Sequence, residues 1–311
     1  MQLSLMNNGG FTLSNFYEEI NNLSIDIEES VPMSRYTTFK IGGAVKYMVT
    51  PKNPQEVSQI VKTAYKYNEK LYVVGNGSNM LICDEGIDGV FMHIGEAMSE
   101  IQLISENTIK CSAGALLVKV CNFALEHSLE GMETAYGIPG SVGGGLYMNA
   151  GAYGGEMKDY VVKAEFVDRE GNFGECDLSD MKLSYRHSAF ADDGRIITAV
   201  YITLKKGSYD EIKERMKDYM FRRKSKQPLE FPSAGSVFKR PEGYFAGALI
   251  EECGLKGKNI GGAFVSEKHA GFIVNKGGAT AKDVLDLIEL CKKTVKSEKG
   301  VELEPEIRCL S

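Results

Sequence analysis

Short apolar runs separated by turn-forming residues recur through the first two thirds of the chain. Five of them have the length of a strand, and most are flanked by Gly, Asp or Asn; they lie at residues 70–74, 90–94, 108–112, 160–168 and 196–204. Residues 53–68 and 116–129 instead carry apolar side chains at helical spacing. We expect the apolar positions of both kinds to pack in a core, so residues 36–206 are predicted to be mainly β with a few helices.

The pattern changes after Gly207. Ser208-Tyr-Asp-Glu211 has the form of a capping box, and it predicts a helix to about Arg223. Two further helices are predicted at 243–253, ended by Gly254, and at 280–296, with short strands at 263–266 and 271–274 between them. The last third of the chain is therefore predicted to be a compact α/β unit.

These patterns divide the chain into three parts. We expect an N-terminal helical segment over 1–30, a domain over 31–207 and a second domain over 208–311.

Charge and composition exclude several functions. The chain of 311 residues has 36 Lys and Arg against 42 Asp and Glu, a net charge of −6, which argues against nucleic acid as a partner. No run approaches the roughly 20 apolar residues of a membrane span, and the N-terminus lacks the features of a signal peptide. The seven cysteines form no C-x-x-C pair, and the four histidines have no ligand spacing. We expect a cytoplasmic protein without a metal site or membrane insertion, as a monomer or weak homodimer.

Glycine marks two candidate phosphate-binding turns. In Tyr72-Val-Val-Gly-Asn-Gly-Ser-Asn-Met-Leu81, a strand runs into a G-x-G-S-N turn whose backbone amides can approach a phosphate. Met80 stands where a Rossmann fingerprint has its third glycine, and no P-loop motif occurs in the chain. A tight hairpin is an alternative interpretation of this turn taken alone.

The second glycine cluster runs from Gly137 to Gly155 and holds eight glycines in 19 positions. Its Pro-Gly-Ser turn is followed by three successive glycines, which can direct several amides to one side and suit a pyrophosphate. Interrupting apolar residues such as Ile138 and Leu146 indicate a folded loop rather than a flexible linker. Close backbone packing is the alternative reason for the glycines.

Three later segments indicate little when each is taken singly: Ser184-Tyr-Arg-His-Ser188, Ser233-Ala-Gly-Ser-Val-Phe-Lys239 and Leu303-Glu-Pro-Glu-Ile-Arg308. Together with the two glycine turns and Arg35-Tyr-Thr-Thr-Phe-Lys-Ile-Gly-Gly43, they occur in the order that the UDP-N-acetylenolpyruvoylglucosamine reductase (MurB) family shows. From about Arg35 to Arg308 the chain resembles that family. The short spacing between Arg186 and Ser236 resembles its short, type II form.

This resemblance implies an α+β fold: a two-lobed FAD-binding domain of the vanillyl-alcohol-oxidase type over 31–207, with lobes at about 31–95 and 96–207, followed by a substrate-binding domain over 208–311. It implies that the enzyme uses NADPH and FAD to reduce UDP-N-acetylglucosamine enolpyruvate to UDP-N-acetylmuramate for peptidoglycan. Arg186, Ser236 and Glu306 match the catalytic positions: Arg186 would hold the substrate carboxylate, Glu306 would donate a hydrogen bond, and Ser236 would protonate the α-carbon. One departure is Arg240, where many relatives have Asn.

The binding residues that the resemblance implies fall into two groups. The substrate-binding candidates are Tyr185, Lys226, Lys239 and His269. The FAD-binding candidates are Tyr36, Thr38, Ile41, Gly42, Gly43, Gly75, Asn76, Gly77, Ser78, Asn79, Gly137, Ile138, Pro139, Gly140, Ser141, Gly143, Gly144, Asn149 and Gly151.

Two other functions are weighed against this hypothesis. An FAD oxidase acting on an alcohol or sugar would in many cases attach its flavin through a histidine of the N-terminal lobe, but no histidine precedes His93. A nucleotide-sugar-binding regulator would need the binding sites without a reactive Ser236. A purely structural protein gives no reason for the second glycine cluster.

Overall fold

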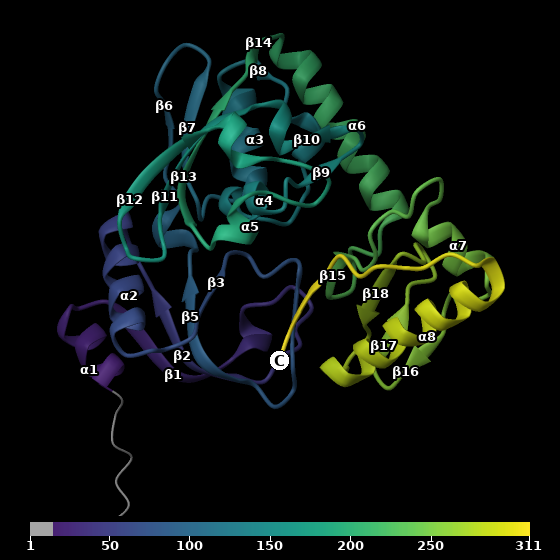
Figure 1. The fold of residues 1–311 in the computed structure, drawn as a ribbon. Helices are drawn as coiled ribbons and strands as arrows, with labels where there is room; N and C mark the ends of the chain where they lie inside the picture. The colour runs from purple at the N-terminus through teal and green to yellow at the C-terminus, as the bar shows by residue number, and fades with distance from the viewer. Residues whose placement is uncertain (1–14) are drawn as a thin grey trace, which may run out of the picture.

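The structure of the protein is a computed structural model that describes residues 15–311 (Figure 1). Its helices are α1 (Asn15–Asn22), α2 (Pro54–Lys66), α3 (Leu117–Glu126), α4 (Val142–Tyr147), α5 (Phe190–Asp193), α6 (Tyr209–Lys226), α7 (Ala246–Glu252) and α8 (Ala281–Lys299). The helices predicted from residue spacing are thus confirmed as α2, α3, α6, α7 and α8.

The first lobe is a four-stranded sheet in the order β1 (Asp26–Pro32), β2 (Ala44–Thr50), β5 (Ile87–His93), β3 (Leu71–Val74). β1 and β2 are antiparallel, whereas β5 lies parallel to both β2 and β3. Asn53 caps α2 by accepting a hydrogen bond from the Glu56 amide, and the apolar face of α2 packs in the same core as Val49 and Val90. This explains the helical spacing of residues 53–68.

The second lobe is an antiparallel sheet in the order β12 (Phe173–Asp177), β11 (Val161–Val167), β13 (Ile196–Thr203), β7 (Thr108–Ser112), β6 (Ile101–Leu103). Two short pairs lie beside it: β8 (Leu129–Glu130) with β14 (Lys205–Lys206), and β9 (Gly151–Ala152) with β10 (Gly155–Glu156). The buried residues of this lobe and of the inner face of the first lobe form one continuous core. The two lobes are therefore packed together.

Helix α6 crosses from the second lobe toward the last part of the chain (Figure 1). Ser208 is its N-cap residue, but the Ser208 side chain makes no capping hydrogen bond, so the predicted capping box is not formed. Ile212 and Met216 of α6 are buried in the core of the two lobes. Because α6 packs with the second lobe, we propose that the C-terminal domain begins at about residue 227 rather than at 208.

The C-terminal domain has an antiparallel sheet in the order β15 (Ser233–Ser236), β18 (Phe272–Asn275), β17 (Ala263–Val265), β16 (Asn259–Ile260). Helices α7 and α8 contribute Leu249, Val284 and Leu287 to its core. Thr280 and Asp283 form a capping box at the start of α8, and Gly254, with a positive φ of 67°, follows the end of α7. The two strands predicted in this region, at 263–266 and 271–274, are confirmed as β17 and β18.

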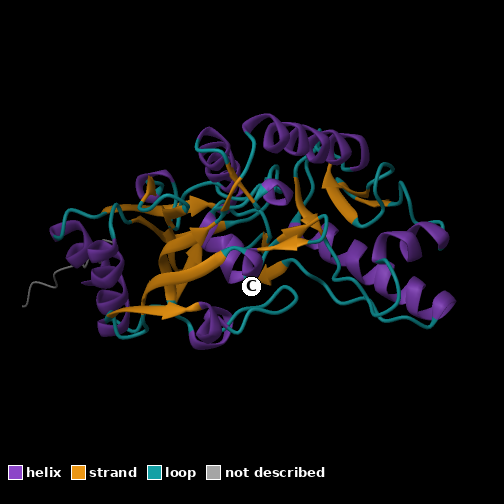
Figure 2. Cartoon of the chain, turned by 90° about the horizontal axis from the view of Figure 1, so that it is seen from above, coloured by secondary structure: helices purple, strands orange, loops and turns teal. Residues whose placement is uncertain are grey.

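The last residues of the chain return to the first lobe. β19 (Arg308–Leu310) pairs in parallel with β4 (Met80–Ile82), which directly follows the first glycine turn. The chain end consequently lies near the middle of the molecule, as both ribbon views show (Figures 1 and 2). The residues just before β19 are thereby held between the two lobes and the C-terminal domain.

The expected helical segment at 1–30 is only partly described, since residues 1–14 lie outside the described residues. Within 15–30 the chain forms α1 and then enters β1 at Asp26, so its last residues are a strand rather than a helix. Across residues 15–311, none of the helices has the length and apolarity that crossing a membrane requires.

Candidate active site

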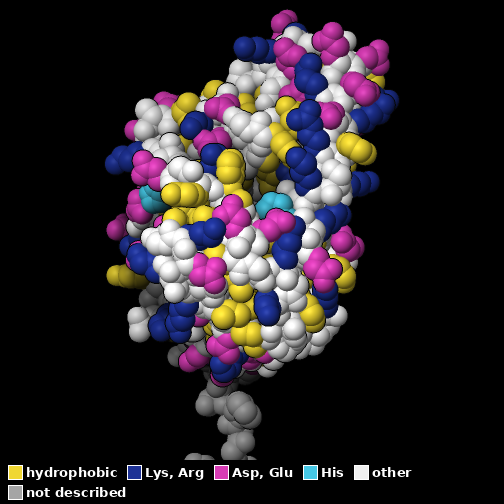
Figure 3. Space-filling view, turned by 90° about the vertical axis from the view of Figure 1, so that its right-hand side faces the viewer, with side chains coloured by type: hydrophobic (Ala, Val, Ile, Leu, Met, Phe, Trp, Pro, Cys, Tyr) yellow, Lys and Arg dark blue, Asp and Glu magenta, His cyan; other side chains and the backbone are white. Residues whose placement is uncertain are grey.

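A cleft of about 1610 Å³ opens where the two lobes and the C-terminal domain meet. Both glycine turns line it, together with β15, the loop before α7 and the segment around Glu306. Figure 3 shows a face of the molecule with a hollow near its centre, edged by hydrophobic side chains. Ligand pockets commonly have about 300–1,000 Å³, so this cleft has room for a large cofactor and a second ligand.

The first glycine turn joins β3 to β4 and lies on the cleft wall. Gly77 has φ of +59°, and a Cβ at this position would collide with the carbonyl oxygen of Tyr36. The Thr38 amide donates to the Gly77 carbonyl over 3.1 Å, and the Thr38 hydroxyl donates to the Ser233 carbonyl over 2.6 Å. Thr38 thus ties the turn to the strand that carries Ser236.

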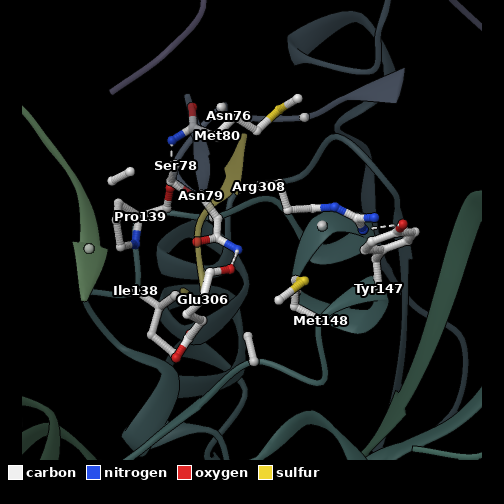
Figure 4. A pocket seen from close by; sticks show the side chains of 18 of the residues that line it. Asn76, Ser78, Asn79, Met80, Ile138, Pro139, Tyr147, Met148, Glu306 and Arg308 are labelled. Atoms are coloured by element: carbon white, nitrogen blue, oxygen red, sulfur yellow. Dashed lines mark hydrogen bonds between the residues drawn. The ribbon is translucent and has the colours of Figure 1, made fainter. Parts of the chain in front are cut away.

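The second glycine turn packs directly against the first on the cleft wall. The Asn76 side-chain amide donates to the Pro139 carbonyl over 2.6 Å (Figure 4), and a Cβ on Gly75 would collide with the Ser141 hydroxyl. At Gly140, by contrast, a Cβ would meet no atom nearer than 3.7 Å. The two turns therefore form one glycine-lined cradle, here defined as residues 75–79 and 137–144, in which a Cβ at Gly140 would make only ordinary van der Waals contacts.

Gly77→Ala is expected to lower the free energy of unfolding by more than Gly254→Ala does. Both positions have positive φ, which costs an L-residue about 1–2 kcal/mol. A Cβ added at Gly254 would have no atom within 4 Å, whereas one at Gly77 would also meet the Tyr36 carbonyl. Denaturant titration of both variants measures the difference. Equal losses of stability would contradict the close approach at Gly77.

Arg186 and Glu306 form an ion pair on the cleft wall. The Arg186 Nε donates to Glu306 Oε1 over 2.7 Å, and its Nη2 donates to the Gly151 carbonyl over 3.1 Å. Their side chains are only 18% and 15% exposed. Arg186 has φ of +55°, an uncommon conformation for a residue other than glycine that is often found at functional sites.

Backbone pairing brings Glu306 beside the Ser236 strand. The Glu306 amide donates to the Val237 carbonyl over 2.7 Å, and the Asn79 side chain donates to the Glu306 carbonyl over 3.2 Å (Figure 4). Burial raises the pKa of Glu306 above its ordinary value, although the Arg186 guanidinium acts in the opposite direction. Burial thus favours the protonated form of Glu306, whereas the ion pair with Arg186 favours the ionised form.

Ser236 lies at the end of β15, on the same cleft. Its hydroxyl donates to the Phe238 carbonyl over 3.3 Å, a long hydrogen bond that leaves it available to a ligand. His269 also lines the cleft, and its Nδ1 accepts a hydrogen bond from the Gly271 amide over 3.1 Å. Burial lowers the pKa of His269, so the neutral ring carries its proton on Nε2 and has this N–H free to donate.

Asn149 and Tyr185 support Arg186 from either side. The fully buried Asn149 donates to the Ser184 carbonyl over 2.9 Å and to Glu156 over 3.1 Å. The Tyr185 ring lies 5.0 Å from the Arg186 guanidinium, and its hydroxyl accepts a hydrogen bond from the Arg240 amide. Asn149 does not line the cleft, so in this structure it positions the Arg186 loop.

The structure brings together all three predicted catalytic residues, Tyr185, His269 and most of the predicted cofactor-binding residues. It does not place every predicted residue on the cleft. Gly42 and Gly43 pack closely against Met33 and Asp84 inside the first lobe. The residues absent from the cleft wall are Tyr36, Ile41, Gly42, Gly43, Asn149, Lys226 and Lys239.

Neither of the two predicted substrate-binding lysines lies on the cleft wall, and the structure gives a physical reason for each. Lys226 is exposed at the end of α6, where its charge is solvated. Lys239 forms an ion pair with Glu304. Cations outside the predicted site residues line the cleft instead, namely Arg169, Arg195, Arg223, Arg240, Lys268 and Arg308. Arg308 donates to the Tyr147 hydroxyl (Figure 4), and its place in the Leu303–Arg308 segment was a signal that could have found it.

No group of three or more His, Cys, Asp or Glu side chains among residues 15–311 is arranged to hold a metal ion. The cleft brings an arginine, a hydroxyl and a carboxyl group with a raised pKa beside an amide-rich cradle.

Comparison of the chain with known proteins identifies its family. Residues 45–177 match the family described as FAD binding domain, and residues 227–310 match the one described as UDP-N-acetylenolpyruvoylglucosamine reductase, C-terminal domain. The UDP-N-acetylenolpyruvoylglucosamine reductase of Clostridium perfringens (strain SM101 / Type A) is 46% identical over 298 residues, covering 96% of each chain. That of Caldanaerobacter subterraneus subsp. tengcongensis is 48% identical over 279 residues, covering 89% of this chain and 91% of the relative.

A solved structure agrees. The crystal structure of UDP-N-acetylenolpyruvylglucosamine reductase (MurB) from Thermus caldophilus matches with a TM-score of 0.81 at 34% identity, covering 92% of this chain and 100% of that chain. The expected fold class, a two-lobed FAD-binding domain of the vanillyl-alcohol-oxidase type followed by a C-terminal domain, is confirmed. The chain belongs to the UDP-N-acetylenolpyruvoylglucosamine reductase (MurB) family.

Proposed function

We propose that this protein reduces UDP-N-acetylglucosamine enolpyruvate to UDP-N-acetylmuramate, with NADPH as the hydride donor, FAD as the carrier and Ser236 as the proton donor. The observation that carries the proposal is the convergence of Arg186, Ser236 and Glu306 on one cleft beside the glycine-lined cradle. Family membership supports the same substrate, since the relatives bear the name of this reductase.

The cleft fits FAD. Gly140 lies on the cleft wall without a side chain, and the glycines of the cradle give backbone amides access to a pyrophosphate. Family membership of residues 45–177 in an FAD binding domain supports this assignment. When bound, FAD supplies a two-electron carrier for the hydride between NADPH and the enolpyruvyl group.

Arg186 would bind the carboxylate of the enolpyruvyl group. Hydride addition at the terminal carbon leaves negative charge on the α-carbon, which spreads into this carboxylate. A guanidinium already fixed by the Gly151 carbonyl opposes that charge without reorganising. To pair with the substrate, Arg186 must share or give up its bond to Glu306, because both carboxylates compete for one guanidinium.

This competition changes the protonation of the Glu306 carboxyl group. Burial already raises its pKa, and Arg186 is the group that lowers it most. When a substrate carboxylate neutralises Arg186, this lowering is weakened and the Glu306 carboxyl takes up a proton. In that form it donates a hydrogen bond to the charge that develops on the substrate, and Ser236 delivers its hydroxyl proton to the α-carbon.

Substrate binding is therefore expected to be accompanied by uptake of a proton by Glu306, at pH values above the ordinary pKa of a glutamate. Since the complex holds the proton more tightly than the free enzyme, affinity should fall as pH rises through the pKa of Glu306. Calorimetric titration of the FAD-loaded enzyme in buffers of different ionisation enthalpy measures the uptake.

Two controls separate Glu306 from other titrating groups. Glu306→Gln should abolish the uptake, and UDP-N-acetylglucosamine, which lacks the carboxylate, should produce none in the unaltered enzyme. Equal uptake with Glu306→Gln would assign the proton to another residue.

The proposed function is tested by absorbance spectroscopy under anaerobic conditions. The FAD-loaded protein should lose its visible absorbance on addition of NADPH and regain it on addition of the enolpyruvyl sugar nucleotide. Bleaching without recovery would remove the proposed substrate, and failure to bind FAD after reconstitution would remove the proposed function as a whole.

A further inference from the structure

Arg223 is a buried cation without a counter-charge among residues 15–311. It lies in the last turn of α6 and is 6% exposed. Its Nη1 donates to the Gln227 side chain over 3.1 Å, but Nε and Nη2 are buried and have no hydrogen-bond partner among residues 15–311. None of the ion pairs within the described chain includes Arg223.

A buried guanidinium in this state is costly. An unpaired charge away from water is destabilising, and Arg does not relieve the cost by losing its proton. Its neighbour Arg222 shows the ordinary solution: it is 54% exposed and pairs with Asp218 over 2.6 Å. The chain thus keeps one of two adjacent arginines buried and unpaired, which implies that an anion reaches Arg223 from outside the chain.

An anion can reach Arg223 through the active-site cleft, because Arg223 forms part of the cleft wall. Gly137, at the start of the second glycine turn, has φ of +90°, and a Cβ there would lie 3.1 Å from the Arg223 Nε. The glycine therefore permits a close approach of backbone and guanidinium.

Arg223 lines the same cleft as Arg186, Ser236 and Glu306. Its guanidinium is 5.7 Å from the centre of the Tyr153 ring, and Tyr153 follows closely on Gly151, whose carbonyl binds Arg186. Tyr153 thus joins Arg223 to the segment that positions Arg186, and both arginines line the same cleft.

We propose that Arg223 supplies the counter-charge for the negative charge that bound FAD gains on reduction, and so raises its midpoint potential. The inference rests on the proposed function. A hydride brings two electrons and one proton, so the cofactor that accepts it from NADPH gains one negative charge, and loses it when the hydride passes to the substrate. A fixed cation in a poorly solvated site stabilises the charged form over the uncharged one.

The test is the midpoint potential of FAD bound to Arg223→Met, whose side chain has similar length and no charge. We expect a potential more negative by about 30 mV or more, which corresponds to a tenfold change in the equilibrium between oxidised and reduced cofactor for a two-electron couple. Arg223→Lys, which keeps the charge, should give a smaller shift. Arg222→Met, which removes the adjacent solvated charge, should leave the potential unchanged.

Three results would overturn the inference. An unchanged potential in Arg223→Met, with unchanged FAD affinity, would show that the charge is not felt by the redox centre. Equal loss of affinity for oxidised and reduced FAD would assign Arg223 to the diphosphate. Weaker substrate binding alone would assign it to the sugar nucleotide. Each of these leaves the proposed function intact, because hydride transfer can still be followed.

Stability of the apoprotein gives an independent readout. Removing an unpaired buried charge should raise the melting temperature of apo Arg223→Met above that of the unaltered apoprotein, while reduced FAD should stabilise the variant less. If the methionine variant fails to fold, Arg223→Gln also removes the charge and keeps a polar side chain. A lower apoprotein melting temperature in both neutral variants would show that Arg223 is satisfied without a ligand.

Discussion

Ser236→Ala is expected to lower turnover of the enolpyruvyl substrate by about 10²–10⁴, the usual contribution of a positioned proton donor. The loss should fall on the second half of the reaction only. The Ser236 hydroxyl is proposed to protonate the α-carbon, and nothing in its contacts, a 3.3 Å hydrogen bond to the Phe238 carbonyl, supports a structural role. Bleaching of the FAD absorbance by NADPH should therefore keep its rate, while its return on addition of substrate should become slow.

Stopped-flow absorbance measures the two halves separately. Ser225→Ala is the matched control, because Ser225 is exposed on α6 and its hydroxyl bonds only to the Arg222 carbonyl among the described residues. A Ser236→Ala enzyme with normal recovery of the flavin spectrum would show that another group, or water, is the acid. Retained binding with lost reduction would separate the enzyme from a nucleotide-sugar-binding regulator.

Arg186→Met is expected to lower kcat/KM for the same substrate by about 10²–10³ or more. One preorganised donor to a developing charge is worth about this factor, and the variant also loses a charge-assisted contact to the substrate carboxylate. Both Arg186→Met and Ser236→Ala should still bind FAD, since neither residue belongs to the glycine-lined cradle. The two variants differ in binding: only the arginine variant should bind the enolpyruvyl substrate more weakly.

The measurement is steady-state kinetics combined with substrate titration of the oxidised enzyme. Arg186→Lys separates charge from geometry, because lysine keeps the charge but lacks the planar fork that holds Gly151 and a carboxylate together. Loss of Arg186 also removes the group that lowers the pKa of Glu306, so proton uptake on substrate binding should disappear. An Arg186→Met enzyme that retains uptake would contradict the competition for the guanidinium.

Local sequence patterns predicted most of the regular elements near their observed positions. Residues 108–112 form β7 over the predicted residues, and the segment predicted to be helical at 280–296 is α8. These segments have a clear period of two or of three to four, and each buries one face in a single core. The ordered motifs also predicted the family, the fold class and a site around Arg186, Ser236 and Glu306.

What the sequence predicted less well depends on contacts between distant residues. The parallel pairing of β19 with β4 joins segments more than 200 residues apart, and no local sequence pattern predicts it. The capping sequence at Ser208 forms no cap, since packing of α6 on the second lobe rather than its N-terminal hydrogen bond fixes the helix.

The amino-acid sequence by itself determined the elements with strong periodicity, the two glycine turns, and the identity of the residues that can do the chemistry. Only the tertiary structure decided which cations reach the cleft. Lys226 is solvated, Lys239 pairs with Glu304, and Arg223 is buried without a carboxylate partner among residues 15–311, although all three are basic residues near Ser236 in the sequence. Residue type fixes charge and hydrogen-bonding capacity, whereas burial and partners, which decide what that charge does, arise only when remote segments pack together.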